Sequence, residues 1–306
     1  MSTRCGGALA TALVAVSLFQ PSLSSWQNAP AGEKRVALIS ELTGTASIHL
    51  PASTAPSAVE RFAAISEGAT LEVGPASRAV VVLAGGRRFA VGPEARARVH
   101  ADRLSAISGS VDELSTLPAL PQLVALEAHA PKALGGVRLR ASVITGLSPA
   151  NGSALASRAT LRFTPVAGAA TYRVEIEDAQ GRVIFSIQTT SPEVPVPAGI
   201  LEAGAAYYWT VRTLDRPGAQ ARGSTEFATL RSEEAAVRED LKRRLHDEGG
   251  VSSVALLAAI DRHLGLHQEA LEGFRAALAG APGDESLREA VRELEAMLKG
   301  DSVERQ

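Results

Sequence analysis

The hydrophobic pattern changes its period once along the chain, near residue 231. Before that point, apolar residues alternate with polar ones in short runs separated by glycine and proline, which is typical of antiparallel strands. After it, apolar residues recur every three or four positions, which is typical of helices. A chain with this pattern is expected to build β domains first and to end in a helical segment.

Composition and charge narrow the classes of function. The chain has 306 residues and is 45% hydrophobic, which is ordinary for a globular protein of two or three domains. Its formal net charge is only -2, and arginines are interleaved with glutamates rather than clustered. Such a chain has no strong positive field to concentrate nucleic acid, so we expect no nucleic-acid partner.

Residues 1–29 have the layout of a secretory signal peptide. Arg4 supplies a positive start, residues 8–19 are apolar, and Pro21 precedes a run of mostly small residues. The apolar run is shorter than the roughly 20 residues that span a bilayer, so cleavage is favoured over an uncleaved anchor. The one cysteine, Cys5, precedes the run, so after cleavage neither disulfide nor thiolate chemistry is expected.

The paired glycines Gly85-Gly86 could in principle cradle a phosphate. A P-loop ends in Gly-Lys-Ser/Thr before a helix, and a dinucleotide loop has three spaced glycines that open a helix. Here strand-like residues flank the pair on both sides, 79–83 before it and 87–91 after it. We therefore predict a tight hairpin turn in which the glycines supply positive φ angles.

The segment around these glycines resembles a FecR-like domain, an extracytoplasmic β module of bacterial envelope proteins. The residues that match its pattern are Gly68, Leu71, Gly74, Ser77, Ala79, Val81, Leu83, Gly86 and Val91. The resemblance implies a β domain over 30–117 in the periplasm or cell envelope of a bacterium. FecR-type regulators carry an anti-sigma domain before a membrane span, whereas only a few residues precede the apolar run here.

A proline-rich linker is predicted over 118–136, and a β-sandwich over 137–230. In the sandwich, one strand places Tyr172, Val174 and Ile176 on one face, and a later strand places Tyr207 and Trp209 together. Several such strands with turns between them indicate an antiparallel sandwich.

Residues 147–230 resemble a fibronectin type III or immunoglobulin-like module. Leu201, Gly204 and Tyr207 fit the family's tyrosine corner, in which the phenol bonds back to upstream backbone. Phe163 stands where such modules usually carry tryptophan. The resemblance implies a β-sandwich, and the module resemblances together imply non-catalytic binding or assembly.

Four helices are predicted in the last zone, 231–306. The first is predicted in 232–250, with Ser232 as a cap and its end at Gly249-Gly250, and the others in 251–265, 266–282 and 283–300. The zone resembles a tetratricopeptide repeat at Gly265, Ala270, Leu271, Phe274, Ala277, Leu278 and Pro282, although Asp261 occupies a position that is usually aromatic. Because only one repeat matches well, we expect these helices to bury apolar surface against a neighbour or partner.

The residues that could form a metal site or a catalytic site are better explained by structural roles. His263 and His267 could ligate zinc on one helix face, but the predicted turn at Gly265 separates them and no third ligand has suitable spacing. Glu175 and Glu177 lie on the outward face of a strand, without an apolar pocket to raise a carboxyl pKa. We expect no catalytic, cofactor-binding or metal-binding residue.

A second group of candidates concerns Asp178 and Asn151. Asp178, which could complete a carboxylate pair with its neighbours, is placed in a turn. Asn151 matches a glycosylation acceptor, but an Asn-Gly pair in a turn has its own conformational reason.

The sequence therefore favours a non-catalytic extracytoplasmic scaffold that acts through protein-protein interaction. The predicted partner surface lies on the helical segment at Leu257, Leu271, Phe274 and Leu278. One alternative is a peptidoglycan or polysaccharide binder with Tyr208 as a ligand contact, and another is an envelope signalling component related to FecR-type regulators. A hydrolase with an unrecognised site is the catalytic alternative. Membrane contact is expected only through an uncleaved N-terminal segment.

Overall fold

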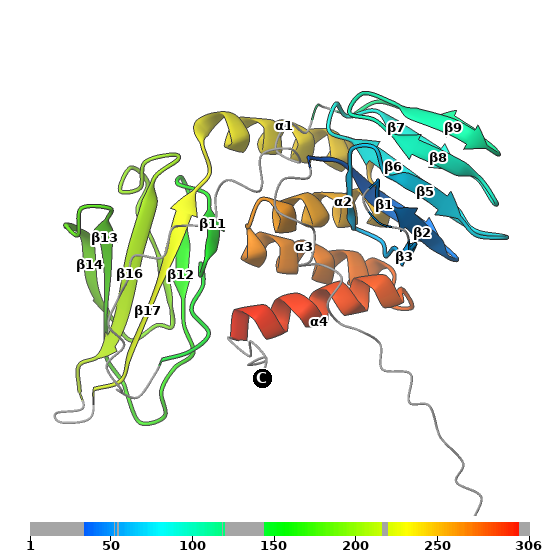
Figure 1. Ribbon diagram of the computed structural model, residues 1–306. Coiled ribbons are helices and arrows are strands. Elements are labelled where there is room, and N and C mark those ends of the chain that lie inside the picture. Colours follow the sequence, from blue (N-terminus) through cyan, green and yellow to red (C-terminus); the bar gives the residue numbers. More distant parts are fainter. Residues whose placement is uncertain are drawn as a thin grey trace, which may run out of the picture. The chain divides into compact units, whose positions relative to one another are not determined.

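The computed structural model describes residues 34–51, 53, 55–117, 119, 144–215 and 220–299 (Figure 1). The predicted signal segment and nearly all of the predicted linker fall outside these residues. The described chain is mostly β-sheet and ends in four helices, as the change of period predicts. Its strands and helices fall inside the ranges predicted for two β domains and a helical segment.

Residues 34–117 form the N-terminal β unit, which contains two five-stranded antiparallel sheets. One sheet has the order β10-β7-β6-β1-β4 and the other the order β3-β2-β5-β8-β9. The strands are β1 (Arg35–Thr43), β2 (Ala46–His49), β3 (Ser57–Ala58), β4 (Ala64–Ser66), β5 (Thr70–Val73), β6 (Arg78–Leu83), β7 (Arg88–Val91), β8 (Arg96–Val99), β9 (Leu104–Ser108) and β10 (Val111–Glu113).

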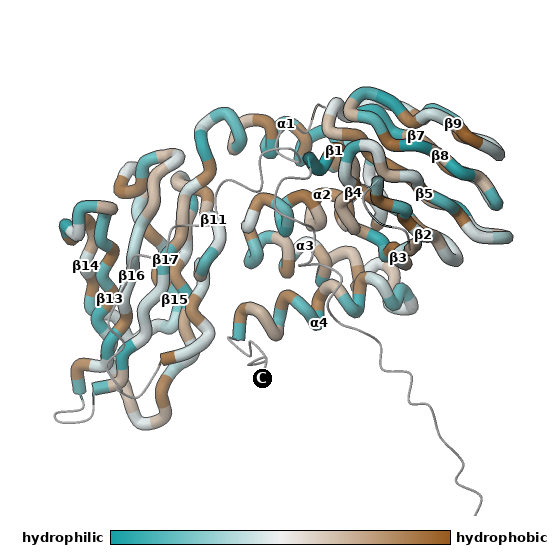
Figure 2. Tube along the Cα trace, in the orientation of Figure 1, coloured by the Kyte–Doolittle hydropathy of each residue, from teal (hydrophilic) through white to brown (hydrophobic). Residues whose placement is uncertain are grey.

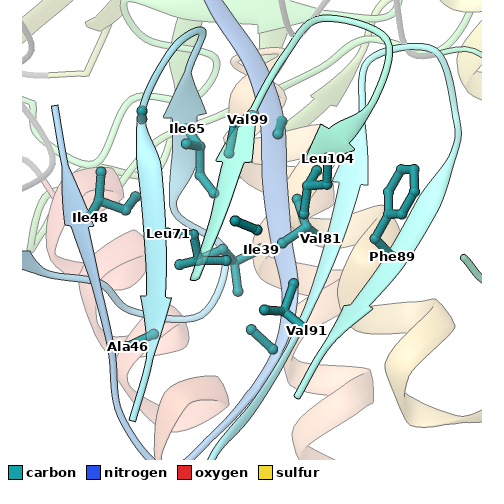
Figure 3. Packing of buried hydrophobic residues seen from close by; sticks show 14 of the residues in the cluster. Ile39, Ala46, Ile48, Ile65, Leu71, Val81, Phe89, Val91, Val99 and Leu104 are labelled. Atoms are coloured by element: carbon teal, nitrogen blue, oxygen red, sulfur yellow. The ribbon is translucent and has the colours of Figure 1, made fainter. Parts of the chain in front are cut away.

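Aliphatic side chains from both sheets form the core of this unit. Ile39 and Val81 from one sheet meet Leu71 and Val99 from the other, and all four side chains are buried (Figure 3). Burying such a side chain contributes about 1.5–3 kcal/mol, so this packing is a main source of the unit's stability.

The two sheets differ in how many of their faces are covered. In β8, buried and exposed residues alternate, so one face of that strand meets solvent. In β6, Ala79–Leu83 are all buried, although alternate residues of a strand point to opposite faces. The second face of this sheet is covered by the helical segment, since α2 contacts β1, which pairs with β6.

The Gly85-Gly86 segment is the turn of the β6–β7 hairpin. The Gly86 N–H donates to the Leu83 carbonyl at 2.8 Å, and the Leu83 N–H donates to the Arg87 carbonyl at 2.9 Å. The prediction of a hairpin is confirmed, with one correction. Only Gly86 has a positive φ, of 84°, so Gly85 is not needed for left-handed backbone.

Residues 144–230 form the second β unit. A five-stranded sheet of order β11-β17-β16-β13-β14 faces a two-stranded sheet of β12 and β15. The strands are β11 (Gly152–Ala154), β12 (Thr160–Arg162), β13 (Tyr172–Asp178), β14 (Val183–Thr189), β15 (Glu193–Pro195), β16 (Ala206–Thr213) and β17 (Arg222–Thr229). All neighbours are antiparallel except β11 and β17, which run parallel.

The predicted alternation of this unit is confirmed. Tyr172, Val174 and Ile176 are buried beside Trp209, and the Trp209 indole N–H donates to the Pro149 carbonyl at 2.9 Å. The Tyr207 hydroxyl accepts a hydrogen bond of 2.7 Å from the Glu202 N–H. This is the backbone contact that the tyrosine-corner pattern predicts.

The C-terminal helices are α1 (Ser232–Glu248), α2 (Gly250–His263), α3 (His267–Gly280) and α4 (Glu285–Lys299). Along α4, hydrophilic and hydrophobic residues are mixed at helical spacing, and its buried residues are Leu287, Ala290 and Leu294 (Figure 2). The predicted Ser232 cap is wrong by one residue. Arg231 is the N-cap, and its backbone N–H donates to the Glu234 carboxylate at 3.0 Å.

Candidate functional site

The helical segment contacts both β units. On one side, Arg61 Nη1 pairs with Asp284 Oδ2 at 2.6 Å, joining the loop after β3 to the chain just before α4. On the other, the Ser153 N–H of β11 donates to the Gly265 carbonyl at 2.8 Å, in the turn between α2 and α3. The expectation that the helices bury surface against a neighbour is met here within the same chain.

A groove of about 190 Å³ lies between α1, α2 and α3 beside the loop that follows β11. Its apolar part comes from α2 and α3 and consists of Val254, Leu257, Ala258 and Gly273. Charged side chains of both signs also line it, namely Arg158, Lys242 and Glu272 at the exposed edge. Val254 is 40% exposed, which is high for a large apolar side chain in this fold.

A buried ion pair forms the polar end of this groove. Arg238 of α1 donates to both carboxylate oxygens of Asp261 on α2, at 2.6 and 2.7 Å, and each side chain is 3% exposed. The third nitrogen of the Arg238 guanidinium, Nη1, donates to Glu239 at 2.7 Å. Such fork-to-fork geometry fixes the spacing and rotation of two helices.

Burial raises the pKa of the Asp261 carboxyl, and the hydrogen bonds from Arg238 act in the opposite direction. Burial also raises the pKa of Glu269, which lies in the first turn of α3 and feels the like charge of Asp261. Glu269 and Asp261 both line the groove. An acid with a raised pKa in a pocket is a common catalytic signature, but Asp261 is already engaged by the guanidinium that it faces.

The two histidines lie at the turn between α2 and α3. His263 is the last residue of α2 and His267 the first of α3, and Gly265 between them has a φ of 74°, so the predicted turn is confirmed. His263 Nε2 lies 3.3 Å from the Phe62 carbonyl oxygen. Burial lowers the pKa of each imidazole to about 4, so both rings are neutral at physiological pH.

The four residues of the predicted partner surface have different positions. Leu257 lines the groove and is half-buried, and Leu278 is also half-buried. Leu271 and Phe274 are buried, and the Phe274 ring packs on Phe62 of the N-terminal β unit. Phe274 therefore makes an intramolecular contact, because the helices have a neighbour in their own chain.

Tyr208 occupies the outward face of the five-stranded sheet, as predicted, while Tyr207 and Trp209 are buried. Its cross-strand neighbours are Glu177 on β13 and Glu226 on β17. An aromatic face between two carboxylates offers one stacking surface and several hydrogen-bond acceptors.

The other candidates singled out in the sequence serve local structure. Glu175 Oε1 lies 3.3 Å from the Ser186 hydroxyl, and Asp178 pairs with Arg182 at 2.7 Å while it accepts backbone N–H groups of its turn. Those hydrogen bonds, that from the Arg182 backbone first, lower the pKa of Asp178. Asn151 has a φ of 49°, a left-handed conformation that asparagine in a turn adopts more readily than most residues.

Sequence reasoning missed Arg238. A signal was present, because Glu234, Arg238, Leu241 and Leu245 follow the helical period and form the buried stripe of α1. A charged residue at such a position requires a buried partner. Asp261 on α2 is that partner.

Within the described ranges, no three or more His, Cys, Asp or Glu side chains gather as metal ligands would. None of the helices in the part of the chain that the structure describes is long and apolar enough to cross a membrane.

No family model matches this chain, and no curated protein matches it. Among solved structures, it is similar to CopC from Methylosinus trichosporium OB3b, at 22% identity over 30% of this chain and 95% of CopC, with a TM-score of 0.24. It is also similar to the fn3 domain of the human collagen alpha-1(XX) chain, at 23% identity over 33% of this chain and 95% of that domain, with a TM-score of 0.26.

A third structure, the FN1-FN3 domains of chicken CNTN1, is 8% identical over 65% of this chain and 58% of that one, with a TM-score of 0.24. Because these TM-scores are all far below 0.5, the similarities carry no argument about what this chain binds.

Proposed function

We propose that this chain is an exported, non-catalytic binding protein of the bacterial envelope that holds a protein partner in the groove of its helical segment. The observation that carries the proposal is the groove at Leu257 and Val254. Its apolar side chains are partly exposed to solvent beside charged side chains of both signs. A partner segment that inserts one apolar side chain and carries flanking charges would match this surface.

The arrangement of charged groups supports binding over catalysis. Arg238 and Asp261 neutralise each other through two hydrogen bonds, and Arg158 and Glu272 pair with Glu239 and Arg162, at 3.4 and 3.5 Å. Groups held in mutual pairs orient helices and partners, whereas a catalytic acid or base has to present its proton to a substrate.

The resemblances to FecR-like, fibronectin type III and tetratricopeptide modules point the same way. Each is a type of module that commonly serves recognition or assembly, and the first two are common outside the cytoplasm. The signal-peptide layout of residues 1–29 supports export to the periplasm or cell envelope.

Site-specific photo-cross-linking tests the proposal. A photoreactive amino acid at Leu257 should give a discrete adduct with a partner in intact cells, and the same group at exposed Ile107 on β9 should not. The substitution Leu257→Glu should reduce recovery of that partner by about tenfold or more, since it places a charge on the apolar contact. Equal adducts at both positions, or recovery unaffected by Leu257→Glu, would refute the proposal.

A second candidate, a glycan-binding surface, is favoured by the position of Tyr208 between Glu177 and Glu226. Retention of the protein on insoluble peptidoglycan should then fall after Tyr208→Ala and persist after Tyr208→Trp, which keeps a stacking face. Equal retention of all three proteins would remove this candidate.

A further inference from the structure

The strand β14 ends its sheet and has one unpaired edge in the part of the chain that the structure describes. It pairs with β13 alone, and Figure 1 shows it at the end of the five-stranded sheet. An unpaired edge presents a row of N–H and C=O groups that another strand can use. At seven residues, β14 is the longest of the strands that end the sheets.

This edge lacks the features that usually block strand addition. Its sequence, VIFSIQT, contains neither a charged residue nor a proline. By contrast, the edge strand β10 carries Asp112 and Glu113, and the edge strand β9 is contacted by β10. β14 is therefore less protected against pairing than either β10 or β9.

Apolar side chains of this strand are also exposed to solvent. Phe185, Ile187 and Thr189 lie opposite Ile176, Val174 and Tyr172 of β13, so they share the face of the sheet that carries the core. The facing sheet has only two strands, and Ile187 remains 39% exposed. Val183, before the irregularity in the ladder, is 53% exposed.

We propose that β14 pairs with β14 of a second copy of this chain, so that two five-stranded sheets join into one. In the antiparallel arrangement with the two-fold axis at Ile187, Phe185 lies opposite Thr189 of the second copy, and Ser186 lies opposite Gln188. Ile187 meets its own counterpart, so the exposed apolar side chains cover each other. Residues 185–189, which pair with β13 without irregularity, all take part in the pairing with the second copy.

The charged residues nearest to the strand do not oppose this occupant, because each is paired within its own copy. Arg182 stands before one end of β14, with its side chain 78% exposed, and Glu193 follows beyond the other end, with its side chain 60% exposed. Arg182 pairs with Asp178 at 2.7 Å, and Glu193, the first residue of β15 in the facing sheet, pairs with Arg162 at 3.1 Å. No like charges lie opposite each other along the shared ladder, and backbone hydrogen bonds supply the affinity.

Analytical ultracentrifugation of the full chain over a range of concentrations tests this dimer. The native chain should dimerise reversibly, and Ile187→Lys should raise the dissociation constant by about tenfold or more, because two ammonium groups would face each other on the axis. The matched control is Ile107→Lys on the exposed part of β9, which should leave the dissociation constant unchanged. Circular dichroism of both variants should show that the sheets remain folded.

Cysteine cross-linking tests the register separately, in a chain in which Cys5 is replaced by Ser. Ile187→Cys should form an intermolecular disulfide, because its counterpart lies directly opposite at the axis. Val183→Cys should not, since its counterpart would lie roughly 27 Å away at about 3.4 Å per residue. A monomer at every concentration, or equal cross-linking of the two cysteines, would overturn the proposal.

Discussion

The ring of Phe62 packs against the ring of Phe274, with the centroids 5.0 Å apart and the planes inclined by 57°. Phe62 belongs to the loop between β3 and β4, and Phe274 to α3, so this contact joins the N-terminal β unit to the helices. Phe62 has a φ of 71°, a conformation that is costly for a bulky residue. Its carbonyl oxygen faces His263, its N–H donates to the Ile39 carbonyl at 2.7 Å, and Arg61 lies over its ring.

Truncation of the Phe62 side chain should strongly destabilise the protein. Phe62→Ala removes a ring that is 2% exposed and leaves a cavity beside Phe274, so the free energy of unfolding should fall by about 3–5 kcal/mol. Urea denaturation measures this change. Ile107→Ala, at a side chain that is 51% exposed, should change it by less than about 0.5 kcal/mol. A loss of similar size in both variants would mean that the contact does not hold the β unit to the helices.

The buried pair Arg238–Asp261 should respond unequally to single and double substitution. Arg238→Met leaves an unpaired buried carboxylate and should cost about 3–5 kcal/mol, as should Asp261→Leu for the guanidinium. The double variant should recover most of that loss, because apolar side chains can fill the same space. Denaturant titrations of the four proteins form the cycle. Additive losses would contradict a direct coupling between the two side chains.

The histidines at the α2–α3 turn should make stability fall in mild acid. Both imidazoles have a pKa lowered from 6.5 to about 4, so between these values the unfolded chain binds more protons than the folded chain. The free energy of unfolding is therefore unaffected by these histidines above about pH 6.5. It decreases as the pH falls toward 4, by at most about 3 kcal/mol for each histidine.

The raised pKa values of Asp261 and Glu269 act in the opposite direction, because the folded chain retains their protons longer. The substitution His267→Gln removes the titration of one histidine and leaves the titration of His263, Asp261 and Glu269 in place. Urea titrations between pH 4 and 7 should show a smaller loss of stability in this variant than in the native chain. An identical pH dependence would mean that His267 titrates normally.

The two glycines of the β6–β7 hairpin should not be equivalent. Gly86 has a φ of 84°, so Gly86→Ala should cost about 1–2 kcal/mol of left-handed strain. At Gly85, an added Cβ meets nothing within 4 Å and the φ is not positive, so Gly85→Ala should be neutral or slightly stabilising. Thermal denaturation distinguishes these outcomes, and equal effects at both positions would contradict the turn geometry.

The tyrosine corner offers a prediction with a control on the next residue. Tyr207→Phe removes the hydroxyl that accepts the Glu202 N–H and should cost about 1–2 kcal/mol, because that donor is left without its partner. Tyr208→Phe should have almost no effect on stability, since Tyr208 lies on the outward face. Equal melting temperatures for the two variants would contradict the role of Tyr207.

The sequence by itself determined the local elements of this protein. Alternation placed Tyr172, Val174 and Ile176 on one face, glycine placed the turns at Gly86 and Gly265, and the change of period placed four helices after residue 231. These features depend on neighbours within a few residues, where backbone sterics and side-chain direction act directly.

The tertiary structure decided which surfaces are covered. Phe274 was predicted to face a partner, yet it is buried on Phe62, 212 positions earlier in the chain, and Arg238 is satisfied by Asp261 on another helix. The continuous apolar run of β6 indicates that both of its faces are buried, but it does not say against what. Packing between segments far apart depends on the shapes and charges that folding brings together, and periodicity along one segment carries no record of them.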